Sequence, residues 1–442
     1  MFALVDVNNM YVSCERVFRP ALNGKPVVVL SNNDGACIAR SNEAKDLGVR
    51  MAQPWFEVRH LERSAGLIAL SANFELYGDM SSRMMSLAAQ YAPRQEIYSI
   101  DECFLDFDGV PGDLVARGRE LRAQVLRWTG LPTSVGFGAS KTLAKLANHV
   151  AKMADRKPGC YPQHLAQVCN LGALSRAELD EVMQRTEVGD VWGIGRKTSA
   201  KLNEGGIRSV LDLVRADPAA LGRQFSVVLE RTVRELRGTP CLNVDDAPAA
   251  NQQIMCSRSF GNPVSELPEL IEVVSQFASR VAARLREQQS VANAVHVFIA
   301  TSPYRRNDRQ HTPSATLPLS RPSADTRQLV SAAVRALRAI HRPGFPYLKA
   351  GVMLVDLQQQ GQQQETLDLF EGELGVEEEA PAPLRERRDL MGTIDALNQR
   401  FGRDAVSVAS AARKTGPSAH ASRQERRSPR YTTRLEEIAT AR

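Results

Sequence analysis

The sequence predicts an α+β protein of several domains, and three successive patterns along the chain support this fold class. Strand and helix signals alternate as far as Ala154, and only helical signals run from Leu165 to Leu236. The order β-α-β-β-α-β then follows from Gln252 to Leu357, and this is the order of a split-βαβ module. At 442 residues the chain has room for about three or four domains.

The composition is that of a globular protein with a mild basic excess. The hydrophobic fraction is 43% and the net charge is +6, so nucleic-acid binding is implied only if the charge is clustered. The seven cysteines form no Cys-x-x-Cys pair, which predicts free thiols in a reducing compartment, not a disulfide framework or a zinc site. The chain begins on a strand pattern and has no apolar run long enough to span a bilayer, so we expect a cytoplasmic protein.

Short apolar segments predict the first strands. Residues 2–7 (FALVDV) and 27–30 (VVVL) are apolar enough to be buried, and turn residues follow at 32–35. A short helix is predicted from Asn42 to Leu47, because Gly48 ends it.

The next segment predicts a hairpin followed by two helices. Residues 97–107 read as two strands joined by a tight turn near Asp101 and Glu102. A helix over 113–128 and a strand over 133–137 follow, and Ser140 is placed to cap a helix that runs to about Ala154.

The second half of the chain starts with helices and a glycine-bearing turn at 193–195. A stretch with Pro and Ala at 245–250 predicts a linker before the split-βαβ module, whose end is marked by a Gln-rich run at 358–364. From Glu371 onward the chain is first acidic and then basic and Ser-rich, and we expect this extension to be poorly ordered alone.

Acidic residues at strand ends are the first candidates for chemistry. Asp6 lies near the end of the first strand, and Asp101 and Glu102 lie at the turn between two others. Carboxylates beside buried strands need positive partners, and a pair of divalent cations held by carboxylates is a device for phosphoryl transfer. Asp6 and Asp101 would bridge two Mg²⁺ ions, with Glu102 and the Val7 carbonyl as further ligands. Alternatively, these are turn and strand-end acids in solvent.

A lysine stripe is predicted on the helix over residues 140–152. Lys141, Lys145 and Lys152 fall within about 40° of one another on a helical wheel. The opposite side is apolar and consists of Leu143, Leu146, Ala147 and Val150. The stripe is expected to face outward, where it suits a phosphate backbone or a triphosphate, and Lys157 adds a cation just beyond the helix. The alternative is a solvated helix face.

Two further features are consistent with nucleotide or DNA binding. The turn Gly193-Ile194-Gly195 opens a helix, so its N–H groups offer a seat for phosphate beside Lys197, unless it is an ordinary helix–helix turn. Tyr11 follows the first strand, where its ring would lie under an incoming sugar and exclude a 2′-hydroxyl. Alternatively, Tyr11 is a core residue.

Together these residues point to a known family. The motifs on which the resemblance rests are DVNNMYVSCE from Asp6, GKPVVVLSNNDG from Gly24, YSIDECFLDF from Tyr98, GASKTLAKLANHVAK from Gly138, VWGIGRKTSAKL from Val191 and SPRYTTR from Ser428. With all six in this order, the chain resembles Y-family translesion DNA polymerases, most closely the UmuC branch, and the resemblance covers nearly its whole length.

The resemblance implies a right-hand polymerase. The palm would comprise residues 1–19 and 73–164, the small fingers 20–72, and a helical thumb with a helix-hairpin-helix motif 165–244. The β-α-β-β-α-β little finger would span 245–357, and a clamp-binding segment with a flexible C-terminal extension 358–442.

The resemblance also implies roles for the candidate residues. Two Mg²⁺ ions would be held by Asp6, Val7, Asp101 and Glu102, and Tyr11 would be a steric gate that selects deoxynucleotides. The triphosphate would contact Lys45 and Lys157. DNA would contact Lys141, Lys145, Lys152, Gly193, Gly195 and Lys197.

Residues 366–370 (TLDLF) resemble the motif by which such polymerases bind the sliding clamp. Leu367, Leu369 and Phe370 would be its apolar anchors, unless the segment is a buried strand edge. Thr366 stands where the family pattern has Gln, and Gln364 would substitute for it. Other departures are Asn42, where many members have Tyr, and Asn8, where other branches have a second acid.

The implied activity is template-directed, error-prone DNA synthesis across lesions in the SOS response. The implied partners are primer–template DNA, a dNTP, a UmuD-type dimer, a RecA filament and the sliding clamp. Two other classes are a catalytically silent DNA-binding repair scaffold, which the intact acids argue against, and a two-metal nuclease. Tyr11 and the lysines disfavour the nuclease.

Overall fold

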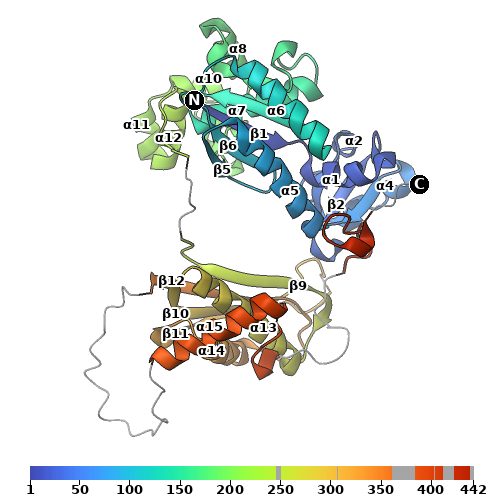
Figure 1. Cartoon of the computed structure of the whole chain (residues 1–442), viewed down its shortest axis with the longest axis vertical. Helices are drawn as coiled ribbons and strands as arrows, with labels where there is room; N and C mark the ends of the chain where they lie inside the picture. The colour runs from blue at the N-terminus through green and yellow to red at the C-terminus, as the bar shows by residue number, and fades with distance from the viewer. Residues whose placement is uncertain (245–249, 306, 361–383, 403, 412–422, 439–442) are drawn as a thin grey trace. The chain divides into compact units, whose positions relative to one another are not determined.

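The computed structural model of the chain describes residues 1–244, 250–305, 307–360, 384–402, 404–411 and 423–438. It forms two compact units, one of residues 1–248 and 424–442 and the other of residues 249–423 (Figure 1). Within these described ranges, no helix is both long enough and apolar enough to cross a membrane.

A five-stranded sheet is the centre of the first unit. Its order is β5 (Arg94–Ile97), β6 (Glu102–Asp106), β1 (Phe2–Val7), β7 (Thr133–Gly138) and β8 (Val168–Asn170). The central strand β1 is antiparallel to β6 and β7, and β8 runs parallel to β7. The short strand β8 corrects the purely helical prediction from Leu165 onward, because its three residues carry too little pattern to be distinguished from a helix.

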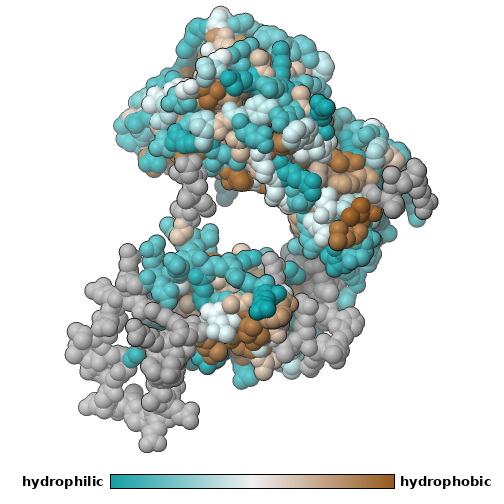
Figure 2. Space-filling view, in the orientation of Figure 1, coloured by the Kyte–Doolittle hydropathy of each residue, from teal (hydrophilic) through white to brown (hydrophobic). Residues whose placement is uncertain are grey.

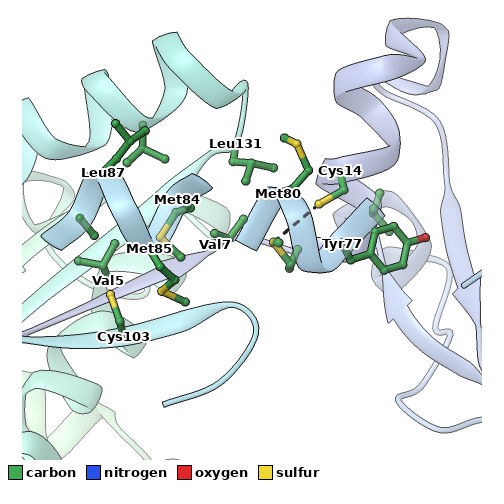
Figure 3. Close-up of a cluster of buried hydrophobic side chains, with 14 of the residues drawn as sticks. Val5, Val7, Cys14, Tyr77, Met80, Met84, Met85, Leu87, Cys103 and Leu131 are labelled. Atoms are coloured by element: carbon green, nitrogen blue, oxygen red, sulfur yellow. Dashed lines mark hydrogen bonds between the residues drawn. The ribbon is translucent and has the colours of Figure 1, made fainter. Parts of the chain in front are cut away.

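Alternate residues of β1 point to opposite faces of this sheet. On one face Ala3, Val5 and Val7 pack against α5 (Phe74–Ala88) and α6 (Leu114–Thr129). Figure 3 shows the methionines of α5 beside Val5 and Val7 in this cluster. The side chains of Phe2 and Leu4 point the other way, toward α7 (Lys141–Arg156). By the same alternation, Asp6 lies on the α7 face.

Helix α7 lies unusually close to the sheet because glycines on β7 leave room for it. A Cβ on Gly136 would lie 2.1 Å from the backbone nitrogen of Asn148, and one on Gly138 would lie 2.5 Å from Leu143. The Ser140 hydroxyl caps the helix by accepting from the Leu143 N–H, as the sequence predicts. The Asn148 amide donates to the Ser134 carbonyl at 2.8 Å and fixes the helix to β7.

A small three-stranded sheet follows α1 (Met10–Phe18) in the chain. Its order is β3 (Cys37–Arg40), β2 (Val27–Leu30) and β4 (Ile68–Ser71). The short helices that surround it are α2 (Asn42–Asp46), α3 (Trp55–Val58) and α4 (Leu61–Ser64). Their own core, which includes Val28, Leu30 and Trp55, is separate from that of the large sheet.

Five helices share one hydrophobic core with the apolar side of α7. They are α8 (Arg176–Arg185), α9 (Arg196–Glu204), α10 (Val210–Arg215), α11 (Pro218–Gln224) and α12 (Val227–Leu236). The predicted apolar residues Leu143, Leu146 and Val150 share one core with residues of these helices. Helix α7 is therefore covered on both sides.

The second unit is the predicted split-βαβ module. Its strands β9 (Ile254–Val264), β10 (Ser290–Thr301), β11 (Ser314–Ser323) and β12 (Tyr347–Gln359) form an antiparallel sheet in the order β11-β10-β12-β9. The helices α13 (Leu267–Glu287) and α14 (Thr326–Ile340) share a core with the sheet. Helix α15 (Leu384–Phe401) joins α13 through an ion pair of Asp395 with Arg286, at 2.6 Å.

The C-terminal extension contains more order than the sequence predicts. Residues 423–438, which we call the C-terminal strap, belong mostly to the first unit, where Ser71 N–H donates to the Arg426 carbonyl at 3.1 Å. Figure 2 shows apolar residues gathered over the strap, whose Leu435 and Ile438 are exposed. The sequence predicts an extension that is poorly ordered alone, and the strap is ordered through partners on distant elements of the first unit, which composition does not reveal.

The close packing of α7 on β7 gives a stability prediction. We expect Gly136→Ala to destabilise the first unit by about 1–3 kcal/mol, because the added methyl group meets helix backbone that cannot move aside. The measurement is urea denaturation followed by tryptophan fluorescence, since all three tryptophans lie in the first unit. Gly78→Ala is the control: it sits in α5 with open space around a Cβ, so the change should be neutral or slightly stabilising. Equal effects of the two substitutions would contradict the packing argument.

Candidate functional site

Three acidic residues from two distant segments meet at one end of β1. Asp6 is the register partner of Glu102 on β6, and the Val7 N–H donates to the Asp101 carbonyl at 2.8 Å. The strand pairing therefore brings together the acids and the Val7 backbone, as the sequence predicts for a metal site.

Each of these carboxylates has a polar partner of its own. Lys152 Nζ lies 2.6 Å from Asp6 Oδ1, and Lys145 Nζ lies 2.7 Å from Glu102 Oε1. Asp101 accepts from the Ser99 hydroxyl at 2.5 Å. The positive partners that buried carboxylates need come from α7.

The expectation that the lysine stripe of α7 faces outward is wrong. Lys141 is buried and paired with Glu96, while Lys145 and Lys152 point at the carboxylates. The helical period shows which residues share a face, but it does not show what covers that face. Here the apolar face packs on helices and the lysine face packs on the acidic edge of the sheet.

The crowding of negative charge is visible in the pKa of Asp6. Burial raises this pKa to about 6, Lys152 opposes the rise, and the nearby Asp101 and Glu102 add to it.

The possible metal ligands at this site are carboxylate and carbonyl oxygens, which are the ligands that Mg²⁺ prefers. In the described part of the chain, no three carboxylate, histidine or cysteine side chains converge closely enough to hold one ion, and two of these acids are turned toward lysines. The residue types fit a divalent cation.

Tyr11 stands beside the acids with its ring supported from one side. Its ring stacks on that of Tyr77 with centroids 4.5 Å apart, and Phe74 contacts it edge-on at 5.9 Å. Burial raises the pKa of Tyr11, and the charge of Asp101 adds to the rise. Tyr11 packs against the hydrophobic core of the first unit and is partly exposed.

Lys45, Arg40 and Arg156 form a basic cluster that extends from the small sheet to the end of α7. Lys45 Nζ donates to the Asn9 side chain at 2.6 Å. Burial lowers the pKa of Lys45 to about 8, and the neighbouring Arg156, Arg40 and Lys152 lower it further. Crowded cations of this kind are characteristic of an anion site.

Two members of this basic cluster were not found from the sequence. Arg40 ends β3 and Arg156 ends α7, and neither belongs to a motif with Lys45. Arg156 is paired with Asp46 at 2.9 Å. The predicted Lys157 is exposed immediately after Arg156. Only the fold brings the two arginines to Lys45, so no spacing along the chain signals them.

The predicted glycine turn is present at the start of α9. Gly193 adopts a positive φ of 85°, and Gly195 is the N-cap of the helix with no side chain capping it. Lys197 is exposed in the first turn. The N–H groups at this helix start are available for an anion.

The predicted clamp motif lies outside the described residues. This applies to Gln364, Thr366, Leu367, Leu369 and Phe370.

Four family models match the chain. The impB/mucB/samB family model matches residues 5–149, and the model of its C-terminal domain matches residues 251–367. The helix-hairpin-helix motif model of the same family matches residues 176–207, which include the glycine turn. A domain of unknown function matches residues 388–441, which include α15 and the strap.

Curated relatives match the chain along its full length. Protein UmuC of Salmonella typhimurium is 43% identical over 99% of both chains, and Protein ImpB of the same species is 41% identical over all of both. DNA polymerase IV 1 of Bacillus subtilis is 27% identical over 90% of both chains.

Solved structures of Y-family DNA polymerases share the fold. A Y-family polymerase chimaera of Dbh and Dpo4 has a TM-score of 0.63 at 19% identity and covers 81% of this chain and 100% of its own. A ternary complex of Dbh with partially disordered substrates has a TM-score of 0.53 at 18% identity, with 80% and 99% coverage.

The basic cluster gives a prediction about Lys45. Because its pKa is lowered to about 8, more of its amine is unprotonated at pH 8 than for an ordinary lysine, so it should react faster with trace acetic anhydride. The measurement is competitive labelling from pH 6 to 11, read by mass spectrometry, with the exposed Lys201 as the control. Arg156→Gln should raise the pKa of Lys45. Identical titration curves for Lys45 and Lys201 would contradict the charge crowding.

Proposed function

The chain belongs to the impB/mucB/samB family, and we propose that its acidic residues at the end of β1 are the catalytic centre of a Y-family DNA polymerase. It is a DNA-directed DNA polymerase that carries out error-prone translesion synthesis in the SOS response. The observation that carries the site assignment is the meeting of Asp6, Asp101 and Glu102 beside a basic cluster.

The substrates follow from the same relatives. Solved neighbours are ternary complexes of a DNA polymerase, which supports primer–template DNA and a dNTP as the substrates of this chain. A UmuD-type dimer, a RecA filament and the sliding clamp complete the proposal as partners, and the cytoplasm is the compartment it implies.

The acids would hold divalent metal, and we assign two Mg²⁺ ions to Asp6, Asp101, Glu102 and the Val7 carbonyl. When bound, such ions lower the pKa of an attacking hydroxyl and neutralise the charge of a leaving pyrophosphate. Lys145 and Lys152 balance the same carboxylates through ion pairs, in which Lys152 is 35% exposed and the other three side chains are largely buried.

The reaction needs no side chain as an obligatory base. The primer 3′-hydroxyl attacks the α-phosphate in line, the new O3′–P bond forms, and the bond to the β-phosphate bridging oxygen breaks with loss of pyrophosphate. The hydroxyl proton leaves to solvent. The acids orient the reacting groups, while the strand pairing keeps their backbone fixed.

The basic cluster is the proposed triphosphate site. Lys45, Arg40 and Arg156 crowd together at a cost that a bound anion would relieve, and the exposed Lys157 is placed to add a fourth charge. The role of Lys45 and Lys157 is the one that the family resemblance implies, and the two arginines are additions from the structure.

Tyr11 is the proposed steric gate. Its ring is packed on one side by Tyr77, so it has little freedom to move away from a ribose 2′-hydroxyl. The asparagine next to the basic cluster, Asn9, has a left-handed φ of 50° and begins the helix that carries the gate.

The proposed DNA contacts differ from those the sequence predicts. The turn at Gly193 and Gly195 with Lys197 is suited to a backbone phosphate and stays in the proposal. Lys141, Lys145 and Lys152 are removed from the DNA contacts, because their ammonium groups are paired with acids of the sheet.

The metal assignment is tested by Asp101→Asn. We expect extension of a labelled primer to fall by about a hundredfold or more, because the amide loses the charge that stabilises the transition state, while DNA binding changes little. Primer extension and DNA binding by fluorescence anisotropy measure the two effects. The exposed Asp108→Asn is the matched control and should extend normally. Undiminished extension by Asp101→Asn would refute the assignment, and shortening of the primer by the native protein would indicate a nuclease.

The gate assignment is tested by Tyr11→Ala. Removing the ring should raise ribonucleotide use by about tenfold or more, because steric exclusion of the 2′-hydroxyl is lost. The measurement is kcat/KM for a dNTP and for the matching rNTP on one primer–template. Tyr91→Ala is the control, since Tyr91 follows the end of α5 opposite to Tyr77 and its hydroxyl bonds to Gln124 of α6. An unchanged ratio for Tyr11→Ala would remove the gate role.

A further inference from the structure

A buried carboxylate connects the C-terminal strap to the aromatic stack of Tyr11. Glu15 lies one turn after Tyr11 on α1 and is 0% exposed. Its Oε1 accepts from the Tyr77 hydroxyl at 2.7 Å and from the Ser428 hydroxyl at 2.9 Å. Ser428 and Glu15 are 413 positions apart in the sequence. One oxygen atom therefore joins α1, α5 and the strap.

Several contacts between the strap and the helices α1 and α5 hold Ser428 in place. The Asn73 amide donates to the Ser428 carbonyl at 3.2 Å, to its hydroxyl at 3.1 Å and to the Pro429 carbonyl at 3.0 Å. Asn73 is also the N-cap of α5, the helix that carries Tyr77. Further along, Tyr431 stacks on Phe18 of α1 with centroids 4.7 Å apart. Ser428 itself is only 4% exposed, so it is a built part of the core.

The network ends on the gate ring. Tyr77 is fully buried, its hydroxyl is held by Glu15, and its ring stacks on Tyr11 at an interplanar angle of 15°. A rotation of the Tyr77 ring would change the support under Tyr11. The position of the Tyr11 ring therefore depends on the hydrogen bonds that Glu15 accepts.

We propose that Ser428 of the C-terminal strap is a positioning residue for sugar selection, acting on Tyr11 through Glu15 and Tyr77. This inference rests on the proposed role of Tyr11 as the gate. Without the Ser428 hydroxyl, the buried carboxylate loses one donor, Tyr77 is held less firmly, and the Tyr11 ring gains freedom to admit a 2′-hydroxyl. Ser428 thus contributes to the selection of the sugar at Tyr11.

The test compares sugar selection in single variants of the full chain. In primer extension with Mg²⁺, Ser428→Ala should lower the ratio of kcat/KM for a dNTP to that for the matching rNTP by about fivefold, the equivalent of one net hydrogen bond. The change should come mostly from a lower KM for the rNTP, with kcat for the dNTP nearly unchanged. Ser428→Thr keeps the hydroxyl and should keep the native ratio. Arg427→Ala is the control, because its exposed guanidinium contacts Gln424 within the strap.

A second arm separates positioning from a general loss of structure. If Ser428 acts through the gate, adding Ser428→Ala to Tyr11→Ala should leave the already raised rNTP use unchanged. Tyr77→Phe keeps the stacked ring but loses the hydroxyl, so it should reproduce the effect of Ser428→Ala, and the two together should give less than the sum. Tryptophan fluorescence in urea checks that the variants remain folded, and Glu15→Gln serves as a second probe of the carboxylate.

The outcomes distinguish the two levels of the proposal. If Tyr11→Ala changes sugar choice and Ser428→Ala does not, the positioning role is refuted and the gate stands. If Tyr11→Ala leaves sugar choice unchanged, the gate itself fails. If Ser428→Ala lowers kcat equally for both sugars, its role is structural and the positioning role is refuted.

Discussion

Charge balance between α7 and the end of β1 is the constraint on which the rest of the first unit depends. Asp6 and Glu102 point from the sheet toward α7. Lys152 Nζ lies 2.6 Å from Asp6 Oδ1, and Lys145 Nζ lies 2.7 Å from Glu102 Oε1. This pairing is possible only because the helix lies close to β7, where Gly136 has no side chain to keep it away. Buried carboxylates without such partners would be energetically costly, so the acids, the lysines and Gly136 depend on one another.

The same helix connects the acidic edge of the sheet to the helical part of the unit. Its N-terminus is bound by α12, where the buried Glu235 accepts from the Thr142 N–H at 3.0 Å and from its hydroxyl at 2.6 Å. A carboxylate at a helix N-terminus also stabilises the helix dipole. These two hydrogen bonds fix the start of the helix that carries the lysines.

The sequence predicts the elements well and their surroundings less well. Strand periodicity and turn residues place β1, β6 and β7, and the acids at their ends follow directly from those strands. The direction of the lysine stripe on α7 is wrong in the prediction, because a helical wheel contains no information about a neighbouring sheet. Arg40 and Arg156 join Lys45 only through the fold, and the partners of Ser428 lie hundreds of residues away, so neither group leaves a local pattern.

The acids and the Tyr11 ring are held in different ways. Charged pairs hold the acids, whereas buried hydrogen bonds and ring stacking hold the Tyr11 ring. The acids are held by ion pairs with lysines of α7, in which Lys152 is 35% exposed while Lys145 and Glu102 are 15% and 14% exposed. The Tyr11 ring, by contrast, is supported by fully buried groups, with Glu15 and Tyr77 both at 0% exposure. Selection by shape requires a wall that does not yield, since a displacement of about 1 Å is enough to lose it. A buried network that includes Ser428 of the strap provides that rigidity.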